Sequence, residues 1–163
     1  RQFIEDDQYD EVIRKAIAYH SLYKVPKGLD SFLLKQVLLI RDSDKLDNFR
    51  VKNIESIQTL FSISDEIFYS QRVSKNILND IENHRLILKE NRHNEVDMWV
   101  SYLAFIFDLN YQSSFRYLLE TNYLEENIDR ISYKNKDTYK KMQLIKSHCY
   151  RYIRYHASLN TKI

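Results

Sequence analysis

Three aspartates within a short run give this sequence its clearest candidate for chemistry: Asp42, Asp44 and Asp47. They follow an apolar segment whose spacing predicts a helix over residues 31–48. On that helix the apolar stripe at positions 33, 37 and 40 continues into Asp44, which we therefore expect to face the core. An ionised carboxylate in a low-dielectric interior is costly unless a cation, a charged neighbour or protonation compensates it.

Asp44 has two interpretations. It can be a ligand of a divalent metal, or it can form an ordinary salt bridge with Arg41 or Lys45 or lie at an exposed helix end. His20 adds to the metal interpretation, because the apolar spacing in a predicted helix over residues 4–22 puts His20 on the inward face. Imidazole and carboxylate are common ligands of Zn, Mn and Fe. A lone inward histidine is, however, more often a hydrogen-bonded core residue, and spacing alone does not join His20 to Asp44.

The elements that position these residues are predicted to be helices only. One Gly and one Pro among 163 residues cannot supply the turns of a many-stranded sheet, and they exclude glycine-rich phosphate loops. Both lie in the loop at 23–29, and no interior linker divides the chain. The fold class is therefore all-α, in a single domain over 1–163. The predicted helices cover 4–22, 31–48, 52–60, 65–69, 72–90, 95–109, 111–120, 123–131 and 137–159.

The cysteine count and hydropathy bear on location. Cys149 is the only cysteine and cannot form an internal disulfide. The sequence shows neither a cationic stretch followed by an apolar segment nor an apolar run of about 18 residues. We expect a cytoplasmic protein with no membrane partner, in which Cys149 is an inert buried thiol.

Charge is distributed unevenly along the chain. The net charge is +2, yet residues 133–163 carry eight Lys or Arg against one acid, Asp137. Cations interleaved with tyrosines can follow a phosphate backbone while the rings stack on bases. The same segment also has an inward stripe, which leaves the cations on a solvated face and makes nucleic-acid binding the less favoured interpretation. The stripe consists of Met142, Ile145, Cys149, Tyr152 and His156.

Two segments resemble the HD-domain metal-dependent phosphohydrolases. Residues 38–47, Leu-Leu-Ile-Arg-Asp-Ser-Asp-Lys-Leu-Asp, are similar to the closing RDADKLD element of that family, and residues 13–20 resemble its helix that ends in a histidine. Residues 99–110 are similar to a helical extension of bacterial members. The resemblance implies an HD-like helical bundle, incomplete at the N-terminus, with residues 1–51 as the second half of the core and residues 52–163 as a C-terminal extension.

The resemblance also implies a site. Asp44 matches the last metal ligand of the family, and His20 matches a histidine that members with two metals add. The implied cofactor is one or two divalent ions, Mn, Fe, Ni, Mg or Zn, and the implied substrate is a nucleotide or other small phosphorylated molecule. Lys45 would neutralise phosphate charge, and is otherwise a surface lysine. Asp42 and Asp47 would either orient the metal ligands or form salt bridges.

The sequence departs from the family pattern in one respect. It contains no contiguous His-Asp pair, and no first histidine precedes such a pair. One explanation is that the other ligands of the complete enzyme lie upstream of Arg1, and the other is that this chain is a degenerate, non-catalytic relative of the family. In both cases we expect this chain alone to bind divalent metal weakly and to be inactive. The alternative function is a non-catalytic all-helical interaction module, for which nucleic acid bound along residues 133–162 is one candidate partner.

Overall fold

The computed structural model describes residues 7–159, and within this range the chain is all-helical, as predicted, with no strand. The helices run in the order α1 (Asp10–Tyr19), α2 (Ser31–Ile54), α3 (Ile57–Phe61), α4 (Asp65–Ser70), α5 (Lys75–Glu82), η1 (Lys89–Asn91), α6 (Glu95–Leu103), η2 (Ala104–Asp108), α7 (Gln112–Thr121), α8 (Tyr123–Asp129) and α9 (Lys136–Ser158), where η marks a 3-10 helix. No helix in this part of the chain is both long and apolar enough to cross a bilayer.

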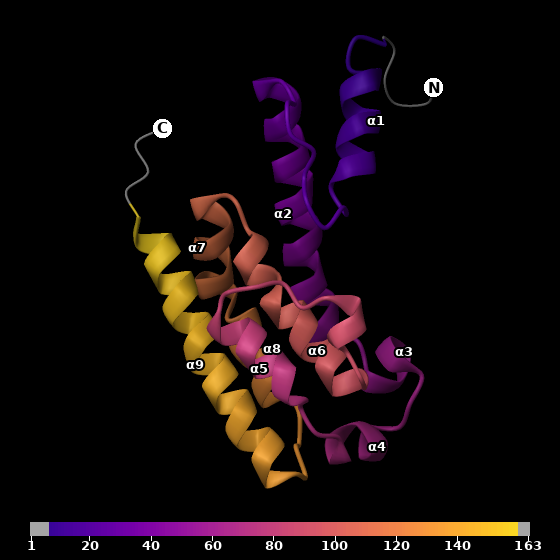
Figure 1. Cartoon of the computed structure of the whole chain (residues 1–163), viewed down its shortest axis with the longest axis vertical. Helices are drawn as coiled ribbons and strands as arrows, with labels where there is room; N and C mark the ends of the chain where they lie inside the picture. Colours follow the sequence, from indigo (N-terminus) through magenta and orange to yellow (C-terminus); the bar gives the residue numbers. More distant parts are fainter. Residues whose placement is uncertain (1–6, 160–163) are drawn as a thin grey trace.

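Helix α2 connects the two parts of the molecule (Figure 1). Its start is fixed by Asp30, whose carboxylate accepts from the backbone N–H groups of Phe32 and Leu33 at 3.0 and 2.9 Å. The first half of α2 packs on α1 in a hairpin that projects from the body, and the second half packs on α6, α7 and α8. The helix continues past residue 51, where the resemblance divides core from extension, and ends at Ile54.

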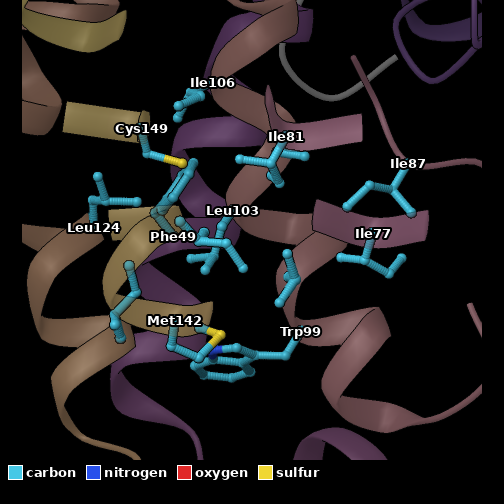
Figure 2. Packing of buried hydrophobic residues seen from close by; sticks show 14 of the residues in the cluster. Phe49, Ile77, Ile81, Ile87, Trp99, Leu103, Ile106, Leu124, Met142 and Cys149 are labelled. Carbon is cyan, nitrogen blue, oxygen red and sulfur yellow. The ribbon is translucent and has the colours of Figure 1, made fainter. Parts of the chain in front are cut away.

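Apolar side chains gather in two clusters. The larger lies between α5, α6, α7, α8 and α9, and Figure 2 shows Trp99, Met142 and Cys149 in this interior. The smaller lies inside the hairpin and consists of the buried residues Ala16, Leu33 and Val37. The fully buried Met142, Ile145 and Cys149 confirm the inward stripe of the last helix over these positions, whereas Tyr152 and His156 are only half-buried.

The predicted helix over 72–90 is wrong in length. Helix α5 ends at Glu82 because His84 adopts a φ of 51°, which a right-handed helix does not allow. The backbone N–H of Arg85 then turns back to the Asp80 carbonyl at 2.9 Å. The break that the sequence predicts between helices 31–48 and 52–60 lies further along the chain, because α2 continues to Ile54. The next helix, α3, is short, and the side chain of its N-cap, Ser56, accepts from the N–H of Thr59 at 3.0 Å. Helix α1 is shorter than predicted at both ends, and residues 4–6 lie outside the described range.

Candidate functional site

The expectation that Asp44 faces the core is wrong. The carboxylate is exposed, and the residues of this run that α2 buries are Arg41, Asp42 and Lys45, which are 3, 2 and 6% exposed. Buried residues recur every fourth position along α2, from Val37 through Arg41 and Lys45 to Phe49. Apolar spacing misjudges the helix phase here because charged side chains occupy the inward positions.

Arg41 joins three segments of the chain. Its Nε and Nη2 donate to the Asp108 carboxylate at the end of η2, at 2.7 and 2.6 Å. Its Nη1 donates to the carbonyls of His20 and Leu22 at 2.7 and 2.5 Å, and Nη2 also reaches the carbonyl of Tyr23 at 3.3 Å. Every guanidinium nitrogen is thus engaged, so Arg41 positions the loop after α1 and is not available to a ligand.

Asp42 caps helix α7 from across the core. Its carboxylate accepts from the backbone N–H groups of Asn110 and Tyr111, both at 3.0 Å, and from the side chains of Asn110 at 2.8 Å and Ser114 at 2.6 Å. These groups lie at the start of α7, where unpaired N–H groups and the helix dipole favour a negative charge. Asp47 has the simpler role of an exposed salt bridge, 2.6 Å from Arg50.

Lys45 is a buried cation with spare hydrogen-bonding capacity. Its Nζ lies 3.0 Å from the Asp108 carboxylate and 5.6 Å from the centroid of the Phe105 ring. Burial lowers the pKa of Lys45, and the neighbouring Asp108 carboxylate opposes the shift. An ammonium group has three N–H donors, and Asp108 is the one hydrogen-bonding partner it has among the described residues.

Asp44 and Lys45 line a common cleft of about 300 Å³. The Asp44 carboxylate forms no hydrogen bond or ion pair with any residue in the described range, so the expected salt bridge to Arg41 or Lys45 is not formed. Both cations pair with Asp108 instead. The remaining lining residues are Ser21, Leu22, Tyr23, Asn48, Leu86, Ile87, Arg92 and Phe105.

His20 does not belong to the lining of this cleft. The residue is half-buried at the C-terminal end of α1, and its Nδ1 donates to the Ile17 carbonyl at 2.6 Å, which leaves Nε2 as the nitrogen able to bind a metal. Its backbone carbonyl, rather than its ring, reaches Arg41. Over residues 7–159 no group of three or more His, Cys, Asp or Glu side chains could hold a metal ion.

Sequence reasoning did not identify two charged residues of the cleft. Asp108 follows an apolar run, and the signal that could have found it is the need of two inward cations, Arg41 and Lys45, for a buried acceptor. Arg92 lies in a polar link between helices and gives no such signal. Its Nη2 donates to the Ile87 carbonyl at 3.0 Å, and its buried Nε has no hydrogen-bonding partner within the described structure.

The charge of the basic segment from residue 133 onward, which includes α9, is partly neutralised by acidic side chains. Lys134 pairs with Glu66, Lys141 with Asp137, and Lys146 with both Glu125 and Asp129, at distances of 2.6 to 2.9 Å. The exposed side chains of Lys136, Lys140 and Arg151 form no such pair in the part of the chain that is described. This face is therefore a mixed surface with some free cations.

Comparisons of this chain with protein-family models, with curated proteins and with solved structures found no match.

Proposed function

We propose that this chain forms part of a metal-dependent phosphohydrolase of the HD type that acts on a nucleotide or other small phosphate ester. The observation that supports the proposal best is that Asp44 and Lys45 line the same cleft. Among residues 7–159, Asp44 is an exposed carboxylate without a hydrogen-bonding or ionic partner, and Lys45 is a buried cation whose one such partner is Asp108. A cytoplasmic location, expected from the single cysteine, belongs to the same proposal.

The described residues fit only part of a metal site. Asp44 offers an oxygen ligand and His20 a nitrogen ligand, but His20 does not line the cleft that Asp44 lines. No group of three such ligands exists among residues 7–159, and a catalytic site normally needs three protein ligands. In the proposal Asp44 is one ligand of a divalent ion, and the remaining ligands are supplied from outside this sequence. A bound divalent ion would supply a water of lowered pKa and polarise the phosphoryl oxygen.

The chain's own residues would hold the substrate. Lys45 would donate its free N–H groups to phosphate oxygens, as a point charge on the cleft wall. Asp108 would keep the Lys45 ammonium in place through its 3.0 Å contact. Asp42 would act only indirectly, because it caps α7 and so fixes the segment that follows Asp108.

The proposal is tested by three alanine variants in the complete enzyme, in which all metal ligands are present. We expect Asp44→Ala to abolish bound metal and phosphate-ester turnover, His20→Ala to fall between, and Asp47→Ala to lose least, because it pairs only with Arg50 at the surface. Loss of a direct ligand should exceed the roughly 10- to 100-fold loss typical of a residue that only supports one. Wild-type metal content and rate in Asp44→Ala would refute the assignment.

A second candidate function is an interaction module that binds nucleic acid through residues 133–162. It is favoured by a hollow of about 860 Å³ between α7, α8 and α9, whose lining includes Tyr150, Arg151 and Arg154. The Arg154 guanidinium lies 5.5 Å from the Tyr150 ring centroid. Binding of a single-stranded oligonucleotide that weakens steeply with salt, and is lost in Arg151→Gln, would support this function.

A further inference from the structure

Arg92 carries a buried donor that nothing in the described structure satisfies. A guanidinium has five N–H donors, and the single hydrogen bond that Arg92 forms in this part of the chain runs from Nη2 to the Ile87 carbonyl at 3.0 Å. Its Nε is buried without a partner. An unsatisfied buried N–H is destabilising and rare in native proteins. We therefore expect an acceptor for this donor in the ligand-bound protein.

The other groups of the cleft limit what this acceptor can be. Arg41 is fully engaged, and it shares Asp108 with Lys45. The cleft is lined by three cations, Arg41, Lys45 and Arg92, and two carboxylates, Asp44 and Asp108, which leaves one positive charge in excess. Free donors on two different cations, together with this excess, favour an anion as the acceptor.

We propose that Arg92 and Lys45 together bind the phosphate group of a phosphate monoester in this cleft, and that they do so without a metal ion. On binding, a rotation of the Arg92 side chain would bring the buried Nε and the neighbouring Nη2 to the cleft, where they form the fork that matches two phosphate oxygens. Lys45 would add a point charge from α2. The inference rests on the proposed function, because it identifies the substrate's phosphate-binding groups, and it adds Arg92 to them.

The cleft also indicates what the phosphate is attached to. Leu22, Leu86, Ile87 and Phe105 contribute its apolar lining, and the Phe105 ring lies beside the Lys45 ammonium. Small-molecule sites combine such apolar surface with a few polar groups that fix orientation. The ligand class is therefore a phosphate monoester that carries a flat apolar group, such as an aromatic ring or a nucleobase.

Calorimetric titration in EDTA, with no turnover required, tests the site. The probes are phenyl phosphate, inorganic phosphate and phenol. We expect phenyl phosphate to bind several-fold more tightly than inorganic phosphate, and phenol not to bind measurably. Arg92→Gln should weaken phenyl phosphate binding roughly 10- to 100-fold, and Arg92→Lys should fall between because it keeps the charge and loses the fork. Arg14→Gln, an exposed change of equal charge outside the cleft, should bind as wild type does.

A second measurement does not depend on the folding of a variant. In the wild-type protein, the NMR signal of the Arg92 Nε–H should shift on addition of phenyl phosphate and saturate with the calorimetric affinity. Absence of that shift, or unchanged binding in a folded Arg92→Gln, would overturn the site. Equal binding of inorganic phosphate and phenyl phosphate would overturn the apolar part of the ligand class.

The outcomes separate this inference from the proposed function. If phenyl phosphate binds through Arg92 and the Asp44→Ala enzyme is fully active, the phosphate site is supported and the metal-dependent phosphohydrolase function is refuted. If Asp44→Ala loses activity and no phenyl phosphate binds in EDTA, the phosphohydrolase function is supported and the metal-free phosphate site is refuted.

Discussion

Replacing Asp42 by alanine should destabilise this protein far more than the same change at its neighbours Asp44 and Asp47. All three aspartates belong to one run of carboxylates on α2, yet only the Asp42 side chain is buried, at 2% exposure for the residue. The change removes the acceptor of the first N–H groups of α7. It also removes a negative charge from the positive end of that helix dipole.

The magnitude follows from the groups left behind. Four donors lose the Asp42 carboxylate: the backbone N–H groups of Asn110 and Tyr111 and the side chains of Asn110 and Ser114. The Asn110 side chain keeps a second acceptor, the Asp108 carbonyl at 3.0 Å. Breaking a buried charged network typically costs about 3–5 kcal/mol, and loss of a helix cap about 1 kcal/mol. Asn110 is exposed, so water can satisfy part of the loss. We therefore expect a decrease of about 3 kcal/mol in the free energy of unfolding.

Urea and thermal unfolding followed by circular dichroism measure this change. For a chain of this length, about 3 kcal/mol corresponds to a Tm lower by roughly 6–12 °C. Asp44→Ala and Asp47→Ala are the matched controls, and each should stay within about 0.5 kcal/mol of wild type, because both side chains are exposed. If Asp42→Ala lost less than about 1 kcal/mol, or no more than its two controls, the interhelical cap would not have the assigned role.

Two further predictions concern buried titratable groups. Burial lowers the pKa of Lys52 to about 8, whereas the unfolded chain keeps this proton up to about 10.5. Because the unfolded chain binds the extra proton in this range, the unfolding free energy of wild type relative to Lys52→Met should rise as the pH goes from about 8 to about 10.5. Urea titrations of both proteins across that range check this, and parallel pH profiles would contradict it. Burial raises the pKa of Cys149 to about 12. A thiol reagent at pH 8 should therefore label this residue only as fast as the protein unfolds. Rapid labelling of the native protein would contradict the burial of Cys149.

Local sequence features determined the class of the fold. A single Gly and a single Pro leave few turn-forming residues, and apolar residues at helical spacing recur along the chain. Both are short-range properties, and they correctly predicted an all-helical structure, the loop before α2, the short helix α4 and the buried stripe at Met142, Ile145 and Cys149. The sequence pattern did not predict the left-handed conformation of His84, which ends α5 well before residue 90.

Tertiary structure decided the phase of α2 and therefore the composition of the cleft. The apolar spacing placed Asp44 inward, whereas the fold buries Arg41 and Lys45. Asp108, more than 60 positions away in the chain, reaches both of these buried cations and compensates their charge. Arg92 enters the same cleft from a link between helices. The spacing of residues within α2 cannot predict these distant partners. The free energy of a buried charge depends on groups that only the folded chain brings within hydrogen-bonding distance.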